Sequence, residues 1–149
     1  MATASMWTKL KIAEIRHFFD EYNRKNVSVI DELGNWYAPN VVLHQADGTE
    51  VKGLDAYKQW QRAVFTAFPD IYLTIEDMVL EEDKVALRYT WTGTFKGKMG
   101  DIAPTGKKVT QTVFGIGRYE GGKVAEMWEM ANMLSMYQQM GVSPTPETK

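Results

Sequence analysis

Few side chains in this 149-residue sequence are of the types that transfer protons near neutral pH. The chain has two histidines and no cysteine. His17 falls in a helical pattern, whereas His44 follows the apolar residues 41–43 in a short β-branched run. Because imidazole titrates near neutrality, His44 is the best candidate for a general base that faces an interior site. The alternative is a half-buried histidine that bonds to neighbouring backbone.

The segment V-A-E-M-W-E-M-A-N-M at 124–133 carries two further candidates, Glu126 and Asn132. Both share one face of a regular strand with Trp128, so all three would face a cavity together. A carboxylate in an apolar pocket has a raised pKa and could act as a base, but Glu126 could instead pair with an arginine or lie at a subunit contact. Asn132 cannot relay a proton. Its amide could donate a hydrogen bond to a carbonyl or enolate oxygen, or it could cap the helix that starts at Met133.

Large apolar side chains could line a pocket for a flat, ring-bearing small molecule through offset stacking. The candidates for this wall are Tyr22, Trp60, Phe65, Trp91, Phe95, Met99 and Trp128. Each of them could equally belong to the core of a small domain. Met99 also lies in the glycine-rich segment 97–108, where it could gate an opening.

Hydrophobic spacing predicts the elements that hold these residues. Apolar positions three and four residues apart predict helices around 12–22, 27–33 and 57–68. Alternation predicts strands at 71–76, 85–92, 109–119 and 123–132, and a β-branched run predicts one at 41–45. The last four strands form an antiparallel meander, with Arg88 pointing away from the cavity to make a salt bridge. Three helices over one face of a curved sheet give an α+β fold, and such a cone closes over an interior cavity.

Composition restricts the classes of function. The net charge of −2 gives no basic surplus for nucleic acid, and no apolar run is long enough to span a membrane. Cytoplasm is therefore the expected location. Two isolated histidines without cysteine predict no metal site. We expect a single domain over 1–149, with about six residues at the start and about seven at the end flexible.

Five strings carry a resemblance to a known family. They are A-F-P-D-I at 67–71, G-T-F-K-G at 93–97, A-P-T-G-K at 103–107, G-G-K-V-A-E-M-W at 121–128 and Y-Q-Q-M-G at 137–141. In this order they resemble the SnoaL-like polyketide cyclases, or ester cyclases, of the cystatin-like superfamily that includes nuclear transport factor 2 and ketosteroid isomerase. The resemblance implies a cone with a curved antiparallel sheet, an apolar pocket, and a homodimer formed through the outer sheet face. It also implies an intramolecular aldol condensation without metal or cofactor.

The sequence departs from the family at two positions. Where the family usually has a carboxylate at the end of the last strand this chain has Asn132, and where a histidine often follows the G-T pair it has Phe95. We therefore predict a cofactor-free cyclase or isomerase for a polyketide- or terpenoid-like molecule, in which His44 takes the proton and Asn132 binds the oxyanion. The alternatives are a non-catalytic small-molecule binder of the same fold and a dimeric interaction module.

Overall fold

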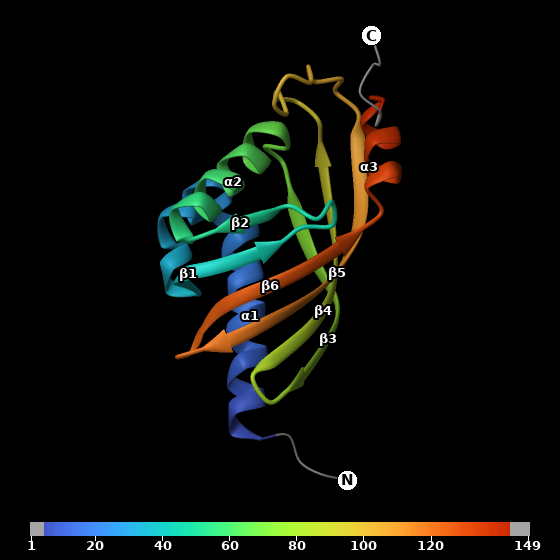
Figure 1. Ribbon diagram of the computed structural model, residues 1–149. Coiled ribbons are helices and arrows are strands. Elements are labelled where there is room, and N and C mark those ends of the chain that lie inside the picture. The colour runs from blue at the N-terminus through green and yellow to red at the C-terminus, as the bar shows by residue number, and fades with distance from the viewer. Residues whose placement is uncertain (1–4, 144–149) are drawn as a thin grey trace.

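The computed structural model describes residues 5–143 of the chain (Figure 1). The elements in chain order are α1 (Met6–Lys25), the 3₁₀ helix η1 (Asn26–Asn35), β1 (Tyr37–His44), β2 (Glu50–Lys52), α2 (Leu54–Ala67), β3 (Tyr72–Glu81), β4 (Lys84–Thr94), β5 (Lys108–Glu120), β6 (Lys123–Ala131) and α3 (Met133–Met140). The predicted flexibility of the chain ends falls largely on residues outside the described range. Within it, the Ser5 hydroxyl accepts the Thr8 N–H and caps α1.

The strands form one curved, six-stranded sheet in the order β2-β1-β6-β5-β4-β3. Strands β3 to β6 make the predicted antiparallel meander, while β1 lies parallel to β6. The three-residue strand β2 is too short for a hydrophobic alternation to reveal it. Figure 1 shows α1 and α2 on the same side of this sheet. The α+β fold class is therefore confirmed, with one parallel pair in the sheet.

The helices are built as their sequence patterns predict. The buried side chains of α1 include Ile15, Phe19 and Tyr22, which form one stripe toward the sheet. Helix α2 starts after Gly53, whose φ of +91° suits a glycine, and ends before Pro69. Among the described residues no helix is long and apolar enough to cross a membrane.

A β-bulge interrupts the pairing of β5 with β6. Arg118 pairs with Glu126, whereas the next residue of β5, Tyr119, pairs with Val124. Ala125 is therefore an extra residue in β6 at this point. Such a bulge changes which face of the sheet the following side chains occupy.

The bulge places a carboxylate on the inner face of the sheet. Val124 faces inward, so a regular strand would bring Glu126 and Trp128 inward as well. Beyond the bulge the alternation is reversed, and Met127 and Glu129 face the helices instead. Glu126 and Trp128 consequently occupy the outer face.

Two glycines leave space on the inner face of β5. Gly115 lies opposite Glu129, and Gly117 lies opposite Met127. A Cβ atom added at Gly115 would come within 3.6 Å of Glu129 Cγ. The absence of side chains at these two positions keeps the region beside Glu129 hollow.

Candidate functional site

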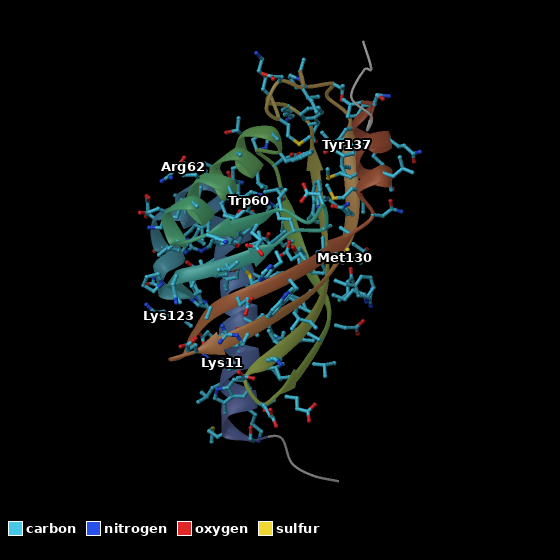
Figure 2. All side chains as sticks on the ribbon, viewed as in Figure 1. Lys11, Trp60, Arg62, Lys123, Met130 and Tyr137 are labelled. Atoms are coloured by element: carbon cyan, nitrogen blue, oxygen red, sulfur yellow. The ribbon has the colours of Figure 1, made fainter. Side chains whose placement is uncertain are left out.

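A cavity of about 420 Å³ lies between the helices and the inner sheet face. This volume falls within the range of small-molecule sites, and the wall is largely aromatic and aliphatic. Asp47 and Ala63 are exposed and also line the cavity, so it reaches the surface between the β1–β2 turn and α2. Trp60 Nε1 donates a hydrogen bond of 3.1 Å to Gln45 Oε1 at this end. Figure 2 shows Trp60 on the sheet side of α2 and Arg62 on the side away from it.

Glu129 is an unpaired acid in the cavity wall. The Tyr89 hydroxyl donates a hydrogen bond of 3.2 Å to Glu129 Oε1, and no basic side chain of residues 5–143 forms a salt bridge with this carboxylate. Burial raises the pKa of Glu129 above the ordinary glutamate range, while the hydrogen bond from Tyr89 lowers it in part. A carboxylate whose pKa is raised in this way is a stronger base than an exposed one.

Hydrogen-bonded phenols share the cavity wall with the acid. The Tyr22 hydroxyl donates to Gln61 Oε1 at 2.9 Å, and Gln61 Nε2 donates to the Tyr57 oxygen at 2.9 Å. Burial raises the pKa of Tyr57 to about 12, against the hydrogen bonds with Tyr37 and Gln61, which lower it. The negative charge of Glu129 raises this pKa as well, which places the acid within electrostatic reach of the network. The cavity thus combines the Glu129 carboxylate with neutral hydroxyl groups, while two further acidic residues, Glu14 and Asp47, also line it.

This arrangement is suited to proton abstraction next to a carbonyl group. A carboxylate with a raised pKa can take such a proton, and hydroxyl donors can stabilise the enolate oxygen that results. The apolar wall excludes much of the water that would otherwise weaken these interactions.

His44 lies outside the cavity, so its predicted orientation is wrong. Leu43 is buried in the core, and alternation along β1 places the next side chain on the outer face. His44 Nε2 lies 2.7 Å from Glu126 Oε2, and Nδ1 lies 3.2 Å from Glu50 Oε1. The imidazole also stacks on Trp128, with 5.2 Å between ring centroids.

Glu126 is likewise on the outer face and not in an apolar pocket. It contacts His44 and lies 3.3 Å from Arg118 Nε. The hydrogen bond with His44, followed by that with Arg118, lowers the pKa of Glu126, opposite to the predicted direction. Pairing with an arginine, the alternative that the sequence left open, is what the structure contains. The predicted salt bridge of Arg88 is also present, with Nε 2.7 Å from Asp77 Oδ2.

Asn132 caps the last helix. Its side-chain oxygen accepts the Ser135 N–H at 3.0 Å, and Asn132 is the N-cap of α3. The residue is not part of the cavity wall. The predicted cap is therefore confirmed, and the structure does not bring this amide to the cavity.

The predicted aromatic wall is partly in place. The members that line the cavity are Tyr22, Trp60, Trp91, Met99 and Trp128. Phe65 stacks on Tyr22 in the core, and Phe95 is fully buried against Phe68. Although Trp128 lines the cavity, its ring stacks on His44, which does not. Whether the lining residues contact a ligand stays a prediction.

Sequence reasoning missed Glu129, Tyr89, Tyr57 and Gln61. Glu129 follows Trp128 directly, and only the bulge at Ala125 moves it inward. The inward glycines of β5 were a usable signal, because two side chains missing from one strand face indicate space that another group or a ligand can fill. Within the described part of the chain, no group of three or more His, Asp or Glu side chains could hold a metal ion.

The sequence matches the SnoaL-like polyketide cyclase family over residues 13–140, so the chain belongs to this family. Its structure is similar to those of three bacterial proteins. A proposed SnoaL-like polyketide cyclase of Jannaschia sp. CCS1 is 19% identical, with a TM-score of 0.86 over 97% of this chain and 100% of that one. AclR of Streptomyces galilaeus, a proposed hydroxylase, is 29% identical, with a TM-score of 0.75 over 93% and 86%. IdmH of Streptomyces antibioticus, a proposed polyketide cyclase, is 24% identical, with a TM-score of 0.68 over 86% and 96%.

No curated protein matches the chain significantly. Membership of the family supports a cyclase- or isomerase-type function in broad terms. The chemistry and the substrate have to be argued from the cavity.

Proposed function

We propose that this protein is a cyclase or isomerase for a carbonyl-bearing, polyketide- or terpenoid-like molecule, with Glu129 as its acid/base. The observation that carries the proposal is a carboxylate without a cationic partner in an apolar cavity, where burial raises its pKa. Glu129 takes the role that the sequence suggested for His44, which faces outward.

The reaction uses only groups of the substrate and the cavity. The Glu129 carboxylate removes a proton from a carbon next to a carbonyl, and the C–H electrons form an enolate. In an aldol cyclisation the enolate carbon attacks a second carbonyl of the same molecule, and the resulting alkoxide takes the proton back from Glu129. In an isomerisation the proton returns to a different carbon. Neither route requires a cofactor, as the family resemblance implies.

The wall supplies the remaining part of the acceleration. Trp60, Trp91 and Met99 offer flat or flexible apolar surfaces on which a chain can fold into its closing conformation. Holding two reacting carbons close together can contribute about 7–11 kcal/mol to lowering a barrier.

Glu129→Gln is the decisive variant, and Glu126→Gln is its matched control on the outer face of the same strand. Purified protein is incubated with carbonyl-bearing polyketide analogues, and products are measured by chromatography and mass spectrometry. We expect the rate to fall by about 10²- to 10⁴-fold in Glu129→Gln and to persist in Glu126→Gln. Equal rates for wild type and Glu129→Gln would exclude the proposed base.

A second candidate reaction is hydroxylation of a ring-bearing substrate. AclR, at 29% identity, is a proposed hydroxylase. Hydroxylation requires dioxygen and electrons, so its product gains an oxygen atom and its rate depends on oxygen. Cyclisation or isomerisation leaves the atomic composition unchanged apart from loss of water. A non-catalytic binder would instead gain thermal stability from a ligand without any turnover.

We also propose that the protein pairs with a second copy through the outer sheet face, as the family resemblance implies. Four apolar residues form an outer patch there: Phe114, Ile116, Trp128 and Met130 are each 38% to 64% exposed. Phe114 pairs with Met130, and Ile116 pairs with Trp128, so they lie side by side on β5 and β6. A contiguous exposed apolar surface of this kind is characteristic of an interface.

A further inference from the structure

We propose that Gly115 and Gly117 determine the ligand specificity of the cavity by forming a slot on the inner face of β5, which takes one flat apolar ring with its edge toward Glu129. The inference rests on the proposed function, because it places the reacting carbon beside the Glu129 carboxylate. The ligand class that it names is a planar ring system with a carbonyl group at its edge.

The first argument is the order of side chains along β5. Val113 is buried on the inner face, and the next two inward positions are Gly115 and Gly117. The outward positions between these residues carry the large side chains of Phe114 and Ile116. Residues two apart in a strand lie roughly 6–7 Å apart, so the two missing side chains leave one continuous gap of about the length of a ring. Glycine weakens the interior of a strand and often marks a place where a ligand approaches the backbone.

The second argument is that no helix fills this gap. The space above Gly93, on the inner face of β4, is filled by Phe68 at the end of α2, whose Cβ lies 3.1 Å from the position of an added Cβ atom. At Gly115 and Gly117 the situation is different. Among the described residues, and apart from their chain neighbours, only atoms of β4 and β6 lie within 4 Å of an added Cβ atom. The gap therefore opens directly into the cavity, whose wall includes both glycines.

The backbone does not require glycine at either position. Gly115 and Gly117 are not among the glycines with positive φ, so an alanine can adopt their conformation. An added methyl group would come no closer than 3.2 Å to another residue, and a shift of a few tenths of an ångström accommodates it. What distinguishes these two glycines is therefore the space above them.

The third argument is the chemistry of the residues that border the slot. Three apolar side chains of paired residues lie beside it: Val85, Leu87 and Met127. Glu129 pairs with Gly115 and is the one acid among the paired residues. Helix α1 covers this face, because its Phe19 packs on Tyr89 with ring centroids 5.6 Å apart, and Tyr89 in turn bonds to Glu129. A slot bounded by strands and helix favours a flat group over a thick one and brings one edge of that group to the carboxylate.

The experiment compares two probes that share an acetyl group. Acetylnaphthalene is flat, whereas acetyladamantane is a thick cage, and isothermal titration calorimetry gives the dissociation constant of each. We expect wild type to bind acetylnaphthalene more tightly. Gly117→Ala should weaken the binding of acetylnaphthalene by about tenfold, because the added methyl group occupies the slot, and should change the affinity for acetyladamantane little.

Gly34→Ala is the matched control. It adds the same methyl group in η1, outside the cavity wall and 3.5 Å from Leu54 Cδ2, and should leave both dissociation constants unchanged. Gly115→Ala tests the other half of the slot. Its methyl group approaches a backbone oxygen, so if this variant does not fold, Gly117→Ala, whose nearest neighbour is the side chain of Val85, decides the question. Equal affinity of wild type for the two probes, or equal effects on both in Gly117→Ala, overturns the inference.

Failure of the proposed function gives a different result, which deuterium exchange detects. In deuterium oxide Glu129 would take a proton from the acetyl methyl group of bound acetylnaphthalene, and the enolate carbon would receive a deuteron from the carboxyl group after its exchange with solvent. Glu129→Gln should lose this exchange and still bind the probe. Binding that depends on Gly117, with no more exchange in wild type than in Glu129→Gln, would retain the slot and refute the base. Exchange at low probe concentration that depends on Glu129 but is unchanged in Gly117→Ala would refute the slot and retain the base.

Discussion

Tyr89 reaches from β4 across β5 to donate a hydrogen bond of 3.2 Å to Glu129 on β6. Gly115 of β5 pairs with Glu129 and contributes no side chain to the space between the two groups. The bond partly offsets the effect of burial on the pKa of the carboxylate. Tyr89 therefore adjusts the acidity of the proposed base.

Replacing this donor should shift the pH dependence of the reaction. In Tyr89→Phe the ionised form of Glu129 loses its hydrogen bond, so its pKa rises further above the ordinary range. The base is active only when deprotonated, and the rising limb of rate against pH should therefore move to higher pH. Tyr119→Phe, which removes a different hydroxyl of the wall, serves as the control with an unchanged limb. A limb displaced to lower pH would contradict the assigned role of Tyr89.

The raised pKa of Glu129 should also make the stability of the protein depend on pH. Because burial raises the pKa of Glu129, the folded state binds this proton more tightly than the unfolded state does. The contribution of Glu129 to the free energy of unfolding should then be greatest below the ordinary glutamate pKa and fall as pH rises through the folded-state pKa, by about 1.4 kcal/mol per unit of pKa difference.

Urea unfolding of wild type and Glu129→Gln from acid to neutral pH measures this contribution of Glu129 to stability. The variant has no titrating group at this position, so the difference in stability between the two proteins should change in favour of the variant as pH rises. Glu126→Gln is the control for which the opposite pH dependence is expected. Its wild-type carboxylate has a lowered pKa, and the corresponding stabilisation is lost as pH falls. Parallel curves for wild type and Glu129→Gln would show that the carboxylate is not desolvated.

The sequence was sufficient to predict the helices, the meander, the apolar cavity and the cap at Asn132, because each depends on local spacing or on a short pattern. The side chains of β6 that face the cavity could not be predicted in the same way. Alternation is a relative rule, and one extra residue at Ala125 reverses it for Glu126 and Glu129 alike. The orientation of His44 was predicted wrongly for a related reason. A short strand with few polar positions does not show in its sequence which of its faces points inward, and its neighbours in the sheet have to be known first.

His44 should be dispensable for turnover. The imidazole contacts Glu126, Glu50 and Trp128 on the outer face and does not line the cavity. His44→Ala should therefore preserve the rate and the position of the pH limb in the assay that detects the loss in Glu129→Gln. A loss of turnover as large as that of Glu129→Gln would show that His44 takes part in the reaction. It would contradict the position of His44 outside the cavity.

Charge placed in the outer patch should separate the proposed dimer. Phe114 is 61% exposed and lies beside Met130, so Phe114→Glu puts a carboxylate into the apolar surface that would be buried between two copies. Burial of an unpaired charge opposes association, whereas the monomer keeps the same side chain in water. Light scattering coupled to size-exclusion chromatography should report a dimer for wild type and a monomer for Phe114→Glu. Leu10→Glu, an equally exposed position on α1 at 61%, should remain dimeric. Because the cavity lies on the opposite face of the sheet, monomeric Phe114→Glu should still gain thermal stability from a ligand of the cavity. A monomeric wild type would refute the proposed interface without affecting the site.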